Sequence, residues 1–233
     1  MEKFKKWFEN FWYHYKWPVI IGAFFVICGS VMAIQFIQRE EYDSLILYTG
    51  PDMPTANEQR DIESAFEQLM TEDFNGDGDY NAVLDPLFLM TDEQLESEEY
   101  SLDENGNPIL INTSEMVKTK ERYTTQIFTG EALICLLDPA WYDEAYKQQA
   151  FVPLKEIIGK TPEGAYNDSA LYLHETDFGK YFSCFDSLPE DTLICFRKMS
   201  SASFLKNKKR EQKKYDYNKE LFIDILEFEI PEK

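Results

Sequence analysis

One nine-residue segment places oxygen-bearing side chains at alternate positions around glycines, a pattern that can bind calcium. Residues 73–81 read DFNGDGDYN. Calcium takes six to eight hard oxygen ligands, and loops of the type D-x-[DN]-x-[DN]-G supply them at every second residue. The candidate ligands, in loop order, are Asp73, Asn75, Asp77, Asp79 and Asn81.

The same segment also has the composition of a plain polar turn. The twelfth loop position, where calcium loops carry a bidentate Glu, is Leu84, and Asp85 comes one residue late. A helix that ends near Met70 must reverse before a strand that begins near Ala82. Asn-Gly and Asp-Gly dipeptides make such turns. The two interpretations are therefore a weak calcium site that stiffens the junction, and a turn that binds nothing.

Cysteine chemistry is the second candidate. Cys135 lies in an apolar run typical of a buried strand, where cysteine acts as a small hydrophobe. Residues 181–185 and 192–197 have the pattern of two strands, and a hairpin between them would place Cys184 opposite Cys195. Exported proteins can hold disulfides. The sequence thus predicts a Cys184–Cys195 bridge if this hairpin forms.

The N-terminal segment is suited to a membrane. Residues 18–37 contain no charge, and 20 residues of helix span a ~30 Å hydrocarbon layer. Residues 1–17 before them repeat aromatic side chains at helical spacing among four lysines, which is typical of a segment that lies at the lipid interface. We therefore expect residues 1–37 to contact membrane lipid, with 18–37 as one transmembrane helix.

Charge on either side of this span predicts its orientation. The lysines lie before it and Arg39-Glu40-Glu41 follows it, which favours a cytoplasmic N-terminus and an extracytoplasmic remainder at the cell membrane. A cleaved signal peptide is the alternative, because Val31-Met32-Ala33 loosely fits a cleavage site. The span is long for a signal peptide, and the aromatic leader is unlike the usual basic start. We therefore expect a retained signal anchor.

The rest of the chain is strongly acidic. The total charge is −20 and residues 1–37 carry +2, which leaves −22 for the remainder. Between Gly50 and Val117 there are 18 acidic residues and one base, Arg60. Such a surface repels phosphate backbones, so nucleic acid is excluded as a partner.

The order of patterns after the linker 38–42 predicts an α/β domain over residues 43–233. Apolar runs at 43–49, 82–90 and 131–137 read as strands. Thr55 with Glu58 forms a capping-box pattern, and Asp138-Pro139 opens another helix. Residues 114–128 and 217–228 have helical periodicity. Alternating strands and helices predict a mixed, mainly parallel sheet covered by helices.

This order resembles the first lobe of extracellular solute-binding proteins of ABC importers, which have the type 2 periplasmic-binding fold. The resemblance rests on the stretch GEALICLLDPAWYDEAYKQQAFVPLKEI at 130–157. Its matching residues are Glu131, Asp138, Pro153 and Leu154. The aromatic leader with one span also resembles a group of membrane-anchored proteins of Gram-positive bacteria. The resemblance implies capture of a small solute.

Three functions follow as hypotheses. The first is a non-catalytic binding domain of solute-binding type, anchored by a single span. The second is a cell-envelope protein that docks another membrane protein. The third is a surface hydrolase. A hydrolase needs convergent catalytic groups, and the only histidine beyond the span is His174. We therefore expect no enzyme.

The expected topology can be tested on intact cells. Added protease should release fragments of residues 43–233 while the N-terminus stays protected, because the lysine excess keeps that end in the cytoplasm. Immunoblots against tags at both ends report the two halves. Full protection of the acidic domain would reverse the predicted orientation.

Overall fold

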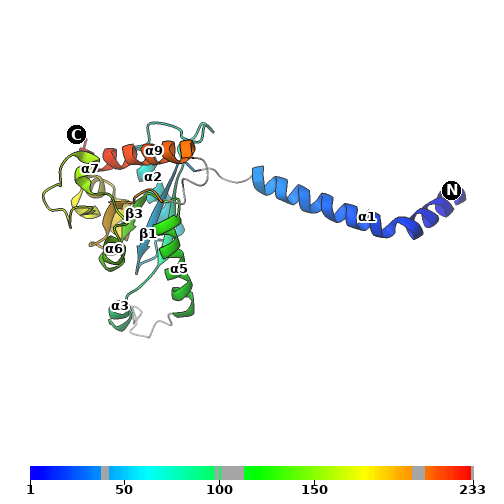
Figure 1. Ribbon diagram of the computed structural model, residues 1–233, viewed down its shortest axis with the longest axis horizontal. Helices are drawn as coiled ribbons and strands as arrows, with labels where there is room; N and C mark the ends of the chain where they lie inside the picture. The colour runs from blue at the N-terminus through cyan, green and yellow to red at the C-terminus, as the bar shows by residue number, and fades with distance from the viewer. Residues whose placement is uncertain (38–41, 98–99, 101–112, 201–207, 232–233) are drawn as a thin grey trace. The chain divides into compact units, whose positions relative to one another are not determined.

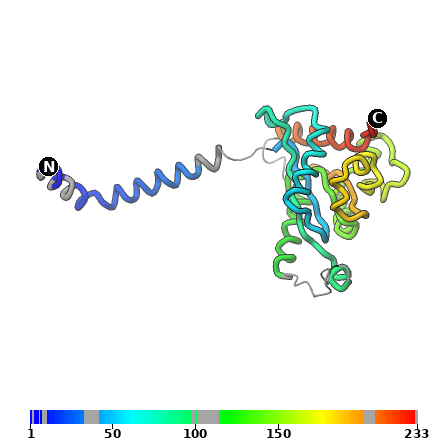
Figure 2. The backbone as a smooth tube through the Cα atoms, turned by 180° about the vertical axis from the view of Figure 1, so that it is seen from behind, coloured from blue at the N-terminus to red at the C-terminus, as the bar shows by residue number. Residues whose placement is uncertain are grey.

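The computed structural model describes residues 1–37, 42–97, 100, 113–200 and 208–231 (Figures 1 and 2). These residues form two compact units that divide between Glu41 and Tyr42. The predicted linker, residues 38–42, lies outside the described residues except for Tyr42.

The first unit is one helix, α1 (Glu2–Ile37), which continues through Pro18. Its segment Phe11–Met32 is long and apolar enough to cross a membrane, and it is the one such segment in the described parts of the chain. The ring of Phe11 stacks on Trp7 at 5.6 Å and on Tyr15 at 5.2 Å. The aromatic leader and the span, predicted as separate segments, thus belong to one helix.

The second unit contains a five-stranded sheet with the order β2-β1-β3-β5-β4. Strand β1 pairs in parallel with β2 and β3, while β5 runs antiparallel between β3 and β4. Four strands therefore share one direction, and their carboxyl ends meet at one edge. The predicted mixed α/β class is confirmed. The strands are β1 (Ser44–Gly50), β2 (Ala82–Phe88), β3 (Ile134–Leu137), β4 (Ala170–Tyr172) and β5 (Leu193–Phe196).

Helices cover both faces of the sheet. Ile46 and Tyr48 of β1 belong to one buried cluster and Leu45 and Leu47 to the other, as the two-residue period of a strand requires. The first cluster contains side chains of α2 (Ala56–Glu67), α7 (Leu154–Ile158), η1 (Leu173–Glu175), α8 (Asp177–Tyr181), η2 (Ser183–Ser187) and α9 (Lys208–Leu226). The second contains side chains of α5 (Thr113–Thr129) and α6 (Pro139–Tyr146). The short helix α3 (Asp92–Glu96) has no buried residue.

Local capping signals are confirmed. At α2, the Glu58 amide donates to Thr55 Oγ1 (3.4 Å) and the Thr55 amide donates to Glu58 Oε2 (2.6 Å), which closes the capping box. At α6, the Ala140 amide donates to Asp138 Oδ1 (2.8 Å), and Pro139 occupies the first turn, where no amide is needed.

The predicted strand at 181–185 is wrong. These residues end α8 and form η2, so no hairpin joins them to β5. Phe178, Phe182 and Phe185 recur at helical spacing, and their rings pack on one another at 5.1 Å. Thr176 opens α8 by accepting from the Gly179 amide (2.9 Å). Helical periodicity and a cap therefore outweigh the strand propensity of the aromatic residues.

Two further boundaries differ from the sequence prediction. Strand β4 is only three residues long and was not predicted, because so short a run gives no periodic signal. Helix α9 begins at Lys208 rather than at residue 217. Its basic first two turns, KKREQKK, carry no apolar stripe from which a helix could be predicted.

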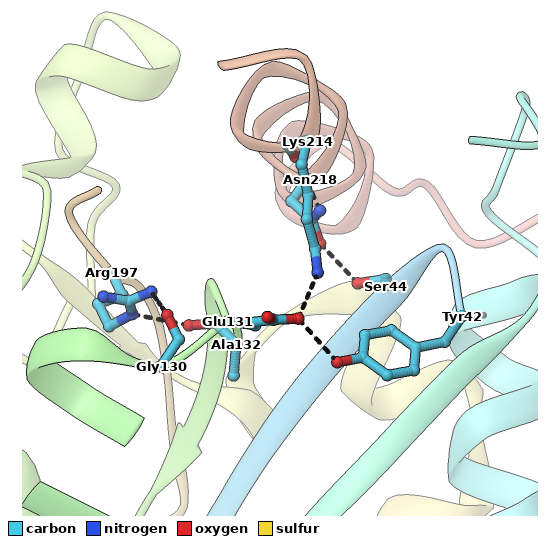
Figure 3. A network of polar contacts seen from close by, with 8 residues as sticks. All are labelled: Tyr42, Ser44, Gly130, Glu131, Ala132, Arg197, Lys214 and Asn218. Carbon is cyan, nitrogen blue, oxygen red and sulfur yellow. Dashed lines mark hydrogen bonds and ion pairs between the residues drawn. The ribbon is translucent and has the colours of Figure 1, made fainter. Parts of the chain in front are cut away.

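Arg197, at the end of β5, is 2% exposed and organises the edge of the sheet where the parallel strands begin (Figure 3). Its guanidinium donates to three backbone carbonyls: Nε to Ala132 (2.7 Å), Nη1 to Ile127 (3.2 Å) and Nη2 to Gly130 (2.7 Å). Burial lowers the pKa of this guanidinium. The carbonyls at the end of α5 offset that cost, because a helix C-terminus attracts a cation.

Replacing Arg197 by Met should destabilise the domain by about 3 kcal/mol, because three buried carbonyls lose their donor. Urea unfolding followed by circular dichroism measures this. The matched control is Arg122→Met, since Arg122 is exposed and pairs with Asp85. That control should cost less than about 1 kcal/mol. An equal, small loss in both variants would contradict a stabilising role for Arg197.

Candidate functional site

A cavity of about 410 Å³ lies at the edge of the sheet where β2 and β3 end. This volume falls in the range of small-ligand pockets. Figures 1 and 2 show α3 beside the N-terminal end of α5, at the opposite end of the domain from α9. The cavity is lined by Leu89, Met90, Thr91, Asp92, Leu95, Met116, Val117, Lys120, Ala140, Trp141 and Glu144.

Hydrogen bonds fix α3 against the strand ends. Thr91 and Gln94 form a capping box: the Gln94 amide donates to Thr91 Oγ1 (3.1 Å) and the Thr91 amide to Gln94 Oε1 (2.8 Å). Gln94 Nε2 also donates to Asp138 Oδ2 (2.8 Å), and the Asp138 amide donates to the Thr49 carbonyl (2.8 Å). The ends of β1, β2 and β3 are thereby tied together beneath the cavity.

Trp141 forms one wall of the cavity and is 6% exposed. Tyr123 Oη donates to the Trp141 carbonyl (2.6 Å), and the two rings pack edge to face at 5.8 Å. Lys120 Nζ lies 4.8 Å from the indole centroid and 3.4 Å from Glu144 Oε2. The cavity thus combines apolar walls with one exposed ion pair. It was not predicted from the sequence, because its walls come from three separate segments.

The predicted calcium loop has a defined conformation in the structure. Both carboxylate oxygens of Asp73 accept backbone amides, Oδ1 from Gly76 and Oδ2 from Gly78 (2.7 Å). Asn75 Oδ1 accepts from the Asp77 amide (2.8 Å), and Asp77 Oδ1 accepts from the Asp79 amide (2.9 Å). The loop side chains therefore turn inward onto the loop itself.

Buried Asp43 holds this loop to the sheet, a role that no motif around it predicts. Asp43 Oδ1 accepts from the Asn75 amide and Oδ2 from the Asn81 amide, both at 2.9 Å. Gly76 and Gly78 have φ of 82° and 99°, where glycine is favoured. These contacts account for a polar turn whether or not an ion is bound.

The ligand chemistry of the loop is only partly assembled. The Gly78 and Gly76 amides lower the pKa of Asp73, which keeps it ionised as a calcium ligand must be. Within the described residues, no three His, Cys, Asp or Glu side chains form a group that could hold a metal ion. Binding at Asp73, Asn75, Asp77, Asp79 and Asn81 stays a prediction.

The structure does not bring Cys184 and Cys195 together. Cys184 lies in η2 and packs against the cluster that contains α2 and α9, whereas Cys195 lies in β5 within the cluster on the other face of the sheet. Both are free thiols, and burial raises the pKa of Cys184 to about 11. The neighbour of Cys195 is Cys135, whose carbonyl accepts from its thiol at 3.7 Å. The hairpin that motivated the bridge does not form.

No protein-family model, curated protein or solved structure matches this chain. Function is therefore inferred from the cavity, the loop and the N-terminal helix.

Calcium binding can be tested by calorimetric titration of the whole protein. If the loop binds the ion, heat should saturate in the sub-millimolar to millimolar range, because the bidentate ligand is missing. Asp73→Ala with Asp77→Ala should abolish this heat. The control is Asp92→Ala with Asp177→Ala, which removes the same charge elsewhere and should leave it unchanged. If the parent gives no heat, or if the parent and both double variants give equal heat, the loop is a plain turn that binds no calcium.

Proposed function

We propose that this chain is a single-pass, membrane-anchored protein whose extracytoplasmic α/β domain binds a small ligand without catalysis. The observation that carries this proposal is the cavity beyond the carboxyl ends of β2 and β3. In open α/β sheets, ligands bind outside the carboxyl ends of the strands, where connecting loops diverge.

The cavity walls favour a ligand with an apolar part. Leu89, Met90 and Trp141 form a largely buried side, and Met116 lies across from the strand ends on α5. Methionine side chains adapt to irregular shapes. In the exposed Lys120–Glu144 ion pair, either side chain can instead bind a polar or charged group of the ligand. An amphiphilic solute of low molecular weight fits both features.

The cavity supports binding rather than catalysis. Most of its described lining is apolar, and two of its ionisable groups, Lys120 and Glu144, are paired with each other. His174 lies elsewhere, in η1, with Nε2 3.1 Å from the Phe185 carbonyl. This contact with Phe185, a member of the buried cluster, supports a structural role.

Chain direction gives the cavity a suitable position in an anchored protein. Tyr42, where the domain connects to the N-terminal helix, lies just before β1. The cavity lies beyond the other ends of the parallel strands. A seven-residue strand is about 23 Å long, so the cavity lies at the far ends of the strands from the anchoring connection.

The resemblance to a solute-binding lobe supports the same proposal. Asp138, one of its matching residues, caps α6 and bonds to Gln94 at the cavity floor. The junction between strand β3 and helix α6 thus lies at the cavity.

One observation favours the alternative of docking to another membrane protein. Tyr181 is 46% exposed, and the Phe228 ring lies 5.3 Å from Tyr181 and 5.9 Å from Phe182. Partly exposed aromatic rings of this kind are enriched in protein interfaces.

Ligand binding can be followed through Trp141, because the other tryptophans all lie in α1. In a full-length chain carrying W7F, W12F and W17F, emission comes from the cavity wall alone. We expect saturable emission changes with a panel of apolar amino acids, dipeptides and short fatty acids. Met116→Glu with Val117→Glu should weaken binding about tenfold or more by charging an apolar wall.

The control for this experiment is Met53→Glu, since Met53 is exposed and lies outside the cavity. It should bind as the parent does, and unfolding curves should show all variants folded. Absence of any response, or equal affinity in the cavity variant, would reject the cavity as the site and favour docking through the aromatic surface.

A further inference from the structure

The first two turns of α9 form the densest cluster of positive charge in the sequence. Residues 208–214 hold five bases and one acid, within a chain whose total charge is −20. Lys208, Lys209, Arg210 and Lys213 are exposed. We call these four residues the basic turn.

The basic turn is followed directly by Lys214, which Figure 3 shows with Glu131 and with Tyr42, the first described residue of the domain. Lys214 Nζ lies 4.9 Å from the Tyr42 ring centroid, and both side chains bond to Glu131 Oε2, at 3.3 Å and 3.1 Å. One turn further on, Asn218 accepts from Ser44 Oγ at the start of β1 (2.6 Å). Helix α9 is thus fixed to the first residues of the domain.

Covalent connection limits how far the basic turn can lie from a membrane. Four residues separate Ile37, the last residue of α1, from Tyr42. A chain of this length spans at most about 18 Å. If α1 spans a bilayer, as the proposed function holds, this short connection lets the domain bring the basic turn to the headgroups.

We propose that the basic turn binds the anionic lipid headgroups of the leaflet that faces the domain. Lys and Arg side chains are attracted to an anionic surface, and the attraction falls off within a Debye length. The acidic remainder of the domain is repelled by the same surface. Attraction at the basic turn therefore turns the opposite end, which carries the cavity, away from the membrane.

Acidic side chains near the basic turn limit this attraction. Lys213 Nζ lies 5.2 Å from the Phe74 ring, within the acidic loop 73–81. Glu131 is already paired with Lys214, whose side chain is 15% exposed. The attraction therefore depends on the exposed lysines of the basic turn, and Lys214 serves mainly to position them.

The test uses the full chain in nanodiscs of phosphatidylcholine alone, or of an equal mixture with phosphatidylglycerol. Mass spectrometry measures how fast lysines are acetylated. We expect Lys208, Lys209 and Lys213 to react about three- to tenfold more slowly in the anionic discs, and high salt to remove the difference. The internal controls are Lys147, Lys155 and Lys160, which are exposed elsewhere and should react alike in both discs.

Matched variants separate the basic turn from overall charge. In the Lys208→Gln, Lys213→Gln chain, protection of Lys209 should be lost. In the Lys147→Gln, Lys155→Gln chain, which has the same net charge, protection of Lys209 should persist. Equal rates in the two kinds of disc would overturn the proposal, as would protection that grows with protein concentration, which indicates the acidic face of a second copy.

This inference rests on the proposed function, because it needs α1 to be anchored in the membrane. The experiment separates failure of the anchor from failure of the lipid contact. A chain that does not stay with the discs contradicts the anchor, and the lipid proposal falls with it. Retention without protection rejects the lipid contact alone. Ligand binding at the cavity is measured separately through Trp141.

Discussion

The buried guanidinium of Arg197 joins three parts of the domain that are far apart in the sequence. It ends β5, and its donors reach the last turn of α5 and the segment that leads into β3. The Arg197 amide also donates to the Leu133 carbonyl (2.8 Å), which extends the pairing of β3 with β5. A cation among helix-terminal carbonyls is stabilised by their dipoles and satisfies groups that would otherwise be buried without donors. One side chain thus holds β5, the antiparallel strand, against the end of α5 and the segment before β3.

This constraint extends to the cavity at the other end of α5. The helix is 17 residues long, so its first turn lies about 25 Å from its last. Midway, Tyr123 bonds to the Trp141 carbonyl and holds α5 against α6. The cavity wall at Met116 and Val117 lies beyond this contact, and Lys120 between them bonds to Glu144 of α6. The cavity therefore has a floor of strand ends and a wall on α5 that is joined to α6 by Tyr123 and Lys120.

Short sequence motifs correctly predicted the features that depend on contacts between residues close together in the chain. Thr55 with Glu58 and Asp138 with Pro139 marked helix starts correctly, because each cap depends on residues within four positions. The error at 181–185 arose because aromatic residues favour strands as well as packed helices, and only the spacing of Phe178, Phe182 and Phe185 separates the two. The cavity could not be predicted in this way. Met116 and Trp141 meet only after β2 and β3 align beside β1, and Asp43 acquires its role only when the loop folds back on it.

The two edges of the sheet at which the strands begin and end differ in the kinds of side chain that surround them. At the edge where the parallel strands begin, charged and polar side chains join separate segments: Asp43 accepts from the Asn81 amide, Glu131 accepts from Lys214 Nζ, and Asn218 accepts from Ser44 Oγ. At the opposite edge the amides of α3 and α6 are satisfied by their own caps, Thr91 and Asp138. Because these caps bond the helix amides, the other side chains at that edge need not accept hydrogen bonds from them. Apolar residues can therefore line a cavity there. The polar edge holds the connection to the N-terminal helix, and the opposite edge holds the cavity with its largely apolar walls.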